Sequence, residues 1–298
     1  MKFGSVDNPG DIDFTLPPDH PATKKVFFNG GNTLQRINVG CAKWNKTDLK
    51  GFYPRGTKDE LEYYSRQFNS IELNATFYNL YSEEQVAKWA GKTPDNFRFF
   101  PKLPQYVSHM KRLKDYQDYL NDYLVGINAF GDKLGMLFLQ MHDNFGPKEE
   151  NVKRLKDFIL DFPNDLRLAV ELRHKDWFMG DIFDEVCQFF EDHNICNILV
   201  DTAGRRDIMH MRMTTPSAFV RYVGANHQSD YDRLDEWVGR IKTWKDQGLE
   251  ELDFFIHQNL EKESPLLATH FIKKLNSELG TNLEIPNAHQ NGQTGLGI

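Results

Sequence analysis

The stretch SIELNATFYNL, residues 70–80, has the two-residue alternation of a buried β-strand. If the stretch is extended, Ile71, Leu73 and Ala75 fall on one face. Glu72 and Asn74 fall on the other. Burying a carboxylate is costly, so Glu72 needs either a charged partner or a function. The stretch therefore predicts a strand with an apolar face toward helices and a polar face toward a site.

Short apolar runs of the same kind recur along the chain and alternate with amphipathic helical patterns. Eight candidate strands begin near residues 36, 70, 97, 134, 167, 196, 218 and 251, and only the connection after the sixth lacks a clear helix. Parallel strands require crossover helices of this sort. The pattern predicts an α/β fold, a (β/α)8 TIM-type barrel. A doubly wound open sheet is the alternative, but the Gly-rich phosphate fingerprint expected of it does not follow the segment GCAKW.

The chain of 298 residues has the length of one large barrel or of two average domains. Residues 1–35 are rich in Gly, Pro, Asp and Asn, and are expected to form an extended N-terminal arm. Residues 36–286 would form a single barrel domain. Residues 287–298 are polar and Gly-rich, and are expected to form a flexible C-terminal tail.

Composition narrows the class of partner. The formal net charge of −7 counts against extended nucleic acid and anionic membranes as partners.

The N-terminus lacks the apolar segment of a signal peptide, and no run approaches the roughly 18 apolar residues of a membrane span. Cys41, Cys187 and Cys196 show no CxxC spacing and are read as buried thiols. We therefore expect a soluble, cytoplasmic protein.

Polar residues gather at the predicted C-terminal strand ends, where barrels place their active sites, and the N-terminal halves of the strands show no matching set. Glu72, Glu171 and Asp201 are the candidate acid/base residues. The alternative is a structural layer in which these carboxylates only neutralise basic neighbours. The residues of this set expected to bind substrate are Asn74, Lys102, Gln140, Arg173, Arg221, His257 and Asn259.

The loops that follow the predicted strands add aromatic rings and histidines. Rings at one rim can wall a pocket for a sugar or a base, and histidine can transfer protons near neutral pH. The loop residues expected to bind substrate are Trp44, Phe77, Tyr78, His109, His174 and Trp177.

These residue types favour an enzyme that applies acid/base chemistry to a small anionic or sugar-like compound, such as a sugar phosphate or nucleoside derivative. The basic side chains would hold its phosphate or carboxylate. A metal-dependent isomerase or endonuclease-like hydrolase would use Glu171, Asp201 and His257 as ligands, but nearby cations oppose this and no HxH or HExxH spacing occurs. No cofactor is predicted. A non-catalytic module for a nucleotide or short single-stranded nucleic acid is the remaining alternative.

Several segments resemble successive motifs of the YecE-like family, a widespread group of barrel proteins classed as a domain of unknown function. The resemblance runs from about residue 37 to about residue 275 through GCAKW, FYPRG, YYSRQFNSIELNATFY, TPDNFRFFPKLP, SHMKRL, VELRHKDWF and FVRYVG.

The resemblance implies a TIM-type barrel with a polar pocket at its C-terminal face. Strand eight departs from the family pattern, because it ends in FFIHQN where an FNN-like end is usual. His257 and Asn259 therefore rest on the residue pattern alone. The family's recurrent residues carry over onto Trp44, Glu72, Asn74, Phe77, Tyr78, Lys102, His109, Glu171, Arg173, His174, Trp177 and Arg221.

Overall fold

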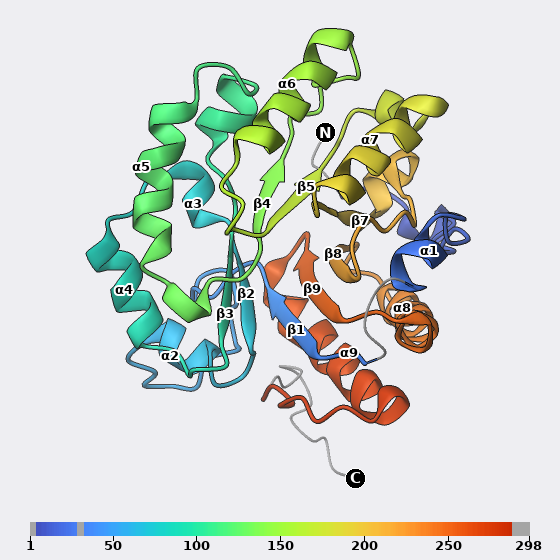
Figure 1. Ribbon diagram of the computed structural model, residues 1–298. Coiled ribbons are helices and arrows are strands. Elements are labelled where there is room, and N and C mark those ends of the chain that lie inside the picture. The colour runs from blue at the N-terminus through green and yellow to red at the C-terminus, as the bar shows by residue number, and fades with distance from the viewer. Residues whose placement is uncertain (1–3, 29–32, 288–298) are drawn as a thin grey trace.

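The computed structural model describes residues 4–28 and 33–287 (Figure 1). The strands are β1 (Arg36–Cys41), β2 (Ser70–Leu73), β3 (Arg98–Pro101), β4 (Leu137–Gln140), β5 (Leu168–Glu171), β6 (Cys196–Asn197), β7 (Leu199–Thr202), β8 (Ser217–Gly224) and β9 (Glu251–Gln258). The α-helices are α1 (Thr23–Phe28), α2 (Glu60–Tyr64), α3 (Ala75–Tyr78), α4 (Glu83–Gly91), α5 (Gln117–Asn128), α6 (Glu149–Asp161), α7 (Asp181–Asp192), α8 (Ser229–Gln247) and α9 (Ser264–Leu279).

Every strand pair within the described ranges is parallel. One sheet has the order β1-β9-β8-β7, a second joins β4, β5 and β6, and a third pairs β2 with β3. The first and last strands of the chain thus lie side by side, and helices surround the strands in Figure 1. The predicted mixed α/β fold with parallel strands is confirmed. None of the helices described is long and apolar enough to cross a membrane.

Side chains alternate between two faces along each strand. On β8, Val220 and Tyr222 belong to the large core shared with the helices, whereas Phe219 belongs to a separate apolar group on the opposite face, here called the inner face. Four rings form a Phe layer on that face, with centroid separations of 4.8 to 5.8 Å. Polar inner-face residues lie on both sides of this layer along the strands. Its members are Phe100, Phe138, Phe219 and Phe255.

Asn69 joins β1 to β2 where no strand ladder forms between the two. Its side-chain Oδ1 accepts a hydrogen bond from the Val39 N–H at 2.9 Å, and its Nδ2 donates to the Ile37 carbonyl at 2.7 Å. One amide side chain thereby satisfies a donor and an acceptor at the edge of β1, much as a neighbouring strand would.

Further along the same two strands, Tyr64 bridges them by hydrogen bonds and Gly40 allows them to approach closely. The Tyr64 hydroxyl accepts from the Cys41 N–H at 2.7 Å and donates to the Ser70 carbonyl at 3.1 Å. A Cβ atom at Gly40 would lie 2.2 Å from the Ser70 carbonyl oxygen, so only glycine permits this approach.

Strand β2 ends earlier than the alternation in SIELNATFYNL predicts. Asn74 has right-handed helical backbone angles and precedes α3. The Thr76 hydroxyl contacts the Leu73 carbonyl at 2.9 Å and the Lys102 carbonyl at 2.8 Å, which holds the turn against β3. The predicted extension of the strand to Thr76 is therefore wrong, because local hydrogen bonds of a threonine outweigh the apolar alternation.

Strand six of the prediction is divided into β6 and β7, with Ile198 between them. The irregular connection expected after it is the 3-10 segment η5 (Ala203–Ile208), followed by extended chain up to β8. The seven amphipathic helical stripes, one expected after each predicted strand except the sixth, correspond to α2, α4, α5, α6, α7, α8 and α9.

The N-terminal residues lie along α8, and α1 lies beside that helix in Figure 1. The Leu16 N–H donates to Glu236 Oε1 at 2.9 Å, and Arg240 Nη1 donates to Asp19 Oδ1 at 2.6 Å. The division into arm, barrel domain and tail stays a prediction. Residues 1–3 of the expected arm and residues 288–298 of the expected tail lie outside the described residues.

We predict that Asn69→Ala lowers the free energy of unfolding by about 2 to 4 kcal/mol, because the backbone groups of Val39 and Ile37 lose their partner. Urea unfolding followed by circular dichroism measures the change. Asn121→Ala on the exposed side of α5 is the control and should change stability by less than about 0.5 kcal/mol. Equal effects of the two variants would contradict the bridging role.

Candidate functional site

Arg221 lies on the inner face of β8 and joins two carboxylates from distant strands. Its Nε and Nη2 donate to Glu72 at 2.9 and 2.7 Å. Its Nη1 donates to Glu171 Oε2 at 2.5 Å and to Gln140 Oε1 at 3.0 Å. Both carboxylates are fully buried, and Arg221 itself is 5% exposed. Bidentate arginine pairs of this kind combine strength with a defined orientation.

Glu72 has two further partners. Asn74 Nδ2 donates to its Oε1 at 2.8 Å, which is possible because the chain turns back immediately after β2. The His257 Nε2 atom, from β9, lies 2.9 Å from its Oε2. The carboxylate is thus oriented from three directions.

Glu171 and Gln140 connect two more cations to Arg221. Arg173 Nε donates to Glu171 Oε1, and Lys102 Nζ donates to Gln140 Oε1 at 3.1 Å. We refer to the connected set as the Arg221 cluster, and its members are Glu72, Asn74, Lys102, Gln140, Glu171, Arg173, Arg221 and His257.

The charges of the Arg221 cluster determine its protonation. Burial alone would raise the pKa of Glu72, but Arg221 and His257 outweigh it and hold the pKa well below its ordinary value. Burial also opposes ionisation of Glu171, yet Arg173 and Arg221 lower its pKa to about 2. Burial, together with Arg221 and Arg173, lowers the pKa of Lys102 to about 7. Near neutral pH both glutamates are ionised, and the Lys102 amine exchanges a proton.

Asp201 does not join the Arg221 cluster. It pairs in register with Tyr222, whose side chain belongs to the helix-facing core, so Asp201 points to that side of the strand. There it contacts Arg206 at 2.5 Å and Arg233 at 2.7 Å, and accepts from Trp237 Nε1 at 2.8 Å. The expectation that Asp201 lies in the mouth beside the other carboxylates is corrected. The physical reason is parity, because Val200, and not Asp201, belongs to the inner apolar group.

The position of Asp201 changes the charge balance. The structural alternative had three carboxylates neutralising three basic residues. With Asp201 on the other face, the Arg221 cluster holds two carboxylates against Lys102, Arg173 and Arg221. When both glutamates are ionised and Lys102 is protonated, the cluster therefore carries a surplus positive charge, before any charge on His257 is counted.

An aromatic pocket of about 290 Å³ adjoins Glu72 and Asn74. The Trp44 and Trp89 rings meet at a centroid separation of 5.6 Å, and the Tyr81 ring lies 4.6 Å from Trp89. Tyr78, which is 64% exposed, stands at its edge. The predicted residues Trp44, Glu72, Asn74 and Tyr78 thus line one pocket. The pattern missed Trp89, because an aromatic residue on a helical stripe is read as core, and it also missed Tyr81 in the connection between α3 and α4.

Phe77 and His109 stand beside Lys102. The Lys102 Nζ lies 4.0 Å from the Phe77 ring centroid, and the His109 ring is 4.8 Å from Phe77. His142, which the sequence did not single out, lies 5.0 Å from His109. Burial and the charge of Lys102 lower the pKa of His109 to about 3, so its ring is neutral near pH 7.

Three predicted substrate-binding residues have other contacts. His174 Nδ1 accepts from the Asp176 N–H at 3.2 Å and so caps the short helix η4 (Lys175–Phe178). Trp177 is fully buried, and its Nε1 donates to the Phe145 carbonyl at 2.5 Å. Asn259 donates to the Gly4 carbonyl at 3.5 Å. These contacts stabilise loops and the N-terminal residues.

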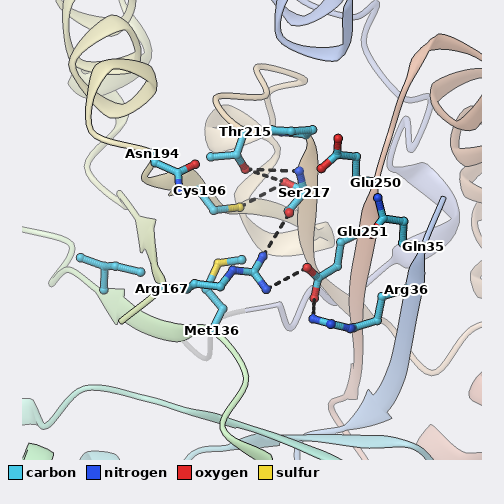
Figure 2. A pocket seen from close by; sticks show the side chains of 12 residues that line it. Gln35, Arg36, Met136, Arg167, Asn194, Cys196, Thr215, Ser217, Glu250 and Glu251 are labelled. Atoms are coloured by element: carbon cyan, nitrogen blue, oxygen red, sulfur yellow. Dashed lines mark hydrogen bonds and ion pairs between the residues drawn. The ribbon is translucent and has the colours of Figure 1, made fainter. Parts of the chain in front are cut away.

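A second polar cluster lies beyond the Phe layer, near the N-terminal strand ends. Figure 2 shows three of its members, Arg36, Arg167 and Glu251. Glu251 accepts from Arg36 at 3.4 Å and pairs with Arg167 at 2.8 Å. Asn38 Nδ2 donates to Asp253 Oδ1 at 2.6 Å. A pocket of about 270 Å³ opens beside these residues. We refer to Arg36, Asn38, Arg167, Glu251 and Asp253 as the Asp253 cluster.

The expectation that the N-terminal strand halves carry no polar set is therefore wrong. Asn38 and Asp253 pair in register and share the parity of Phe255, which could have identified them. Asp253 is fully buried, and its Oδ2 has no hydrogen-bond partner among the residues described. Burial and the nearby Glu251 charge raise the pKa of Asp253 well above its ordinary value.

The predicted metal ligands are not assembled. Within residues 4–28 and 33–287, no three His, Cys, Asp or Glu side chains are grouped as a metal site. Glu171 pairs with two arginines, and Asp201 lies on the other face of the sheet.

These features define a parallel α/β protein with a buried charged cluster at the C-terminal strand ends. The chain belongs to the family described as Protein of unknown function DUF72, whose model matches residues 38–291. This confirms the resemblance to YecE-like proteins.

Relatives share the sequence and the fold. YecE of Escherichia coli is 26% identical over 231 residues, which is 70% of this chain and 82% of YecE. YunF of Bacillus subtilis is 25% identical over 204 residues, covering 64% of this chain and 71% of YunF. The crystal structure of a DUF72 family protein from Thermotoga maritima matches with a TM-score of 0.63 at 25% identity, covering 81% of this chain and all of that one. A DUF72 family protein from Enterococcus faecalis gives a TM-score of 0.66 at 21% identity, with coverage of 85% and 99%.

We predict that Arg221→Met costs about 3 to 5 kcal/mol of stability at pH 7, because two buried carboxylates lose their shared partner. The pKa of Glu171 is lowered in the native protein, so its stabilising contribution is present above pH 4.5 and is lost as the pH falls toward 2. The difference between wild type and variant should therefore shrink in acid. Urea unfolding between pH 3 and 7 measures it.

Arg167→Met is the matched control for this change. Arg167 also pairs with a buried carboxylate, but its side chain is 41% exposed, so the loss should be about 1 kcal/mol. Equal losses for the two variants, or a pH-independent loss for Arg221→Met, would contradict the electrostatic account.

We predict that Asp253→Asn stabilises the protein at pH 7.5. The pKa of Asp253 is raised in the native state, so its stability contribution is complete below pH 3.8 and declines as pH rises toward the folded-state pKa. The amide mimics the protonated carboxyl, so the gain should be large at pH 7.5 and small at pH 4. Glu251→Gln, which breaks pairs with Arg36 and Arg167, should instead destabilise. Thermal unfolding at both pH values distinguishes the two signs.

Proposed function

We propose that the C-terminal strand ends bind a small anionic or sugar-like compound, such as a sugar phosphate, and act on it by acid/base chemistry. The charge balance of the Arg221 cluster carries this proposal. Two buried carboxylates face Arg173, Arg221 and Lys102, so whenever Lys102 is protonated an anionic group of a ligand would complete the neutralisation.

The aromatic pocket beside Glu72 supports the sugar-like part of the ligand. Its volume of about 290 Å³ suits a small ring, and Trp44 and Tyr78 offer faces on which a sugar or base can stack. Glu72 and Asn74 form the polar wall of the same pocket. An anionic substituent could then extend toward Lys102 and Arg173.

The residues have distinct roles in this proposal. Glu72 is ionised and held in one orientation by Arg221, Asn74 and His257, so it can accept a proton as a general base, and its lowered pKa makes it a weak one. Lys102, with a pKa of about 7, is the group suited to donate or accept a proton near neutral pH. Glu171 is held by arginines and provides a fixed negative charge. Lowered pKa values of both glutamates disfavour the protonated carboxylic acid that a two-carboxylate glycosidase needs.

The proposal also includes a closed (β/α)8 TIM-type barrel forming a single domain, preceded by an N-terminal arm. The pairing of β1 with β9 supports closure. The Asn69 and Tyr64 bridges support it between β1 and β2, and the bridge between Lys102 and Phe138 supports it between β3 and β4. Cys41, Cys187 and Cys196 are free and buried, which supports the expected cytoplasmic location.

A thermal-shift screen with sugar phosphates, free phosphate and nucleotides tests the proposal, followed by turnover assays on each stabilising compound. A ligand at 100 times its dissociation constant should add about 2.7 kcal/mol. Glu72→Gln should retain binding but lower turnover by about 100-fold or more. Glu251→Gln, a buried carboxylate of the Asp253 cluster, is the matched control and should leave turnover unchanged.

Two outcomes would contradict the proposed enzyme. Stabilisation by nucleotides alone, without turnover, would favour the non-catalytic nucleotide-binding alternative, which the stacking surface of Trp44 also suits. Turnover that survives Glu72→Gln would place the chemistry elsewhere.

A further inference from the structure

Lys102 is an unusual lysine, because its amine is buried without a carboxylate partner. The residue is 7% exposed, and the acceptor for its Nζ among the described residues is the neutral Gln140 Oε1. No carboxylate of those residues forms an ion pair with Nζ within 4.0 Å. The nearby carboxylates are instead occupied by Arg173 and Arg221.

We propose that Lys102 is a nucleophile that forms a Schiff base with the aldehyde or ketone group of a small anionic compound. This inference rests on the proposed function, since it assigns the carbonyl compound to the same site. It identifies a substrate class and a covalent step that acid/base chemistry by Glu72 alone does not include.

The environment of Lys102 favours a neutral amine. Only the unprotonated amine has the lone pair that attacks a carbonyl carbon. Burial and the charges of Arg221 and Arg173 lower the pKa of Lys102 to about 7, so about half of the amine is unprotonated at pH 7. The Phe77 ring, 4.0 Å away, favours the charged form by a cation–π contact, but burial outweighs it.

The same cations favour an anionic substrate. Arg221 and Arg173 lower the pKa of Lys102 by more than Glu171 and Glu72 raise it, so the net field at the amine also attracts a carboxylate or phosphate attached to the carbonyl compound. The charge that keeps the amine neutral therefore also concentrates its reaction partner. A neutral aldehyde of equal size would lack this attraction.

The step is balanced without a further reactant. The Nζ lone pair forms the C–N bond, the carbonyl π electrons move to oxygen, and one nitrogen proton passes to that oxygen to give a carbinolamine. The C–O bond then breaks, and the hydroxyl group leaves as water with the second nitrogen proton. The nitrogen lone pair completes the C=N bond.

Reductive trapping tests the inference. The wild-type protein is incubated with glyoxylate or glyceraldehyde 3-phosphate and sodium cyanoborohydride between pH 6 and 9, and labelled peptides are measured by mass spectrometry. Labelling of Lys102 should be at least tenfold faster than that of Lys133 at pH 7, and its rate should rise with a midpoint near pH 7. A neutral aldehyde, propionaldehyde, should label Lys102 several-fold more slowly than glyoxylate.

Lys133 is the matched control within the same chain. Its side chain is 15% exposed, but its Nζ donates to the carbonyls of Ala90 at 2.8 Å and Thr93 at 2.6 Å. Lys102→Met should remove the fast label without changing the labelling of other lysines. Labelling of Lys102 at pH 9 no faster than of Lys133, or a rate that rises without a midpoint up to pH 9, would overturn the inference. Both criteria use the wild type, so they hold even if the variant does not fold.

Non-carbonyl analogues separate this inference from the proposed function. If glycolate or glycerol 3-phosphate stabilises the wild type while Lys102 is not trapped, the Schiff base is wrong and the anion site stands. If Lys102 is trapped but no anion or sugar stabilises the protein, the nucleophile stands and the proposed anionic ligand fails.

Discussion

The bidentate pairing of Arg221 with Glu72, extended to Glu171, is the interaction on which the inner face of this protein depends. It connects β8 to β2 and β5, strands that are far apart in the sequence. Removing two carboxylates and a guanidinium from water is expensive, and only their mutual contacts compensate for it. The same contacts keep both glutamates ionised, and they leave Lys102 without a carboxylate partner. Stability and the chemical character of the candidate site thus arise from one set of bonds.

The Phe layer divides the inner face into two polar regions with different chemistry. At the N-terminal strand ends, Glu251 pairs with two arginines, and burial favours the protonated, uncharged form of Asp253. At the C-terminal strand ends, the basic side chains of the Arg221 cluster exceed the carboxylates, and an aromatic pocket adjoins them. The first arrangement suits a structural role, whereas the second suits the binding of an anion. The difference in charge balance between the two clusters is what distinguishes the candidate binding site from the structural one.

Much of this arrangement was predictable from residue patterns. The strands and the seven helical stripes followed from apolar periodicity, and residues such as Glu72, Lys102 and Arg221 followed from their parity at strand ends. Asp201 was misplaced because its strand is interrupted at Ile198, and parity is uncertain across such a break. Trp89 was missed because a tryptophan on an amphipathic helix resembles core. The end of β2 was misjudged because the Thr76 hydroxyl makes hydrogen bonds that alternation does not report.

The sequence by itself determined the class of fold and the family, because hydrophobic periodicity and the local motifs are properties of neighbouring residues. It also determined which residue types gather at the strand ends. Only the tertiary structure decided which of them meet. Whether Glu72 pairs with Arg221, whether Asp201 faces helices, and whether Lys102 keeps a carboxylate partner all depend on strand register and side-chain reach across the sheet. A single residue of register reverses the face on which a side chain lies, and the charge balance of a buried cluster changes with it.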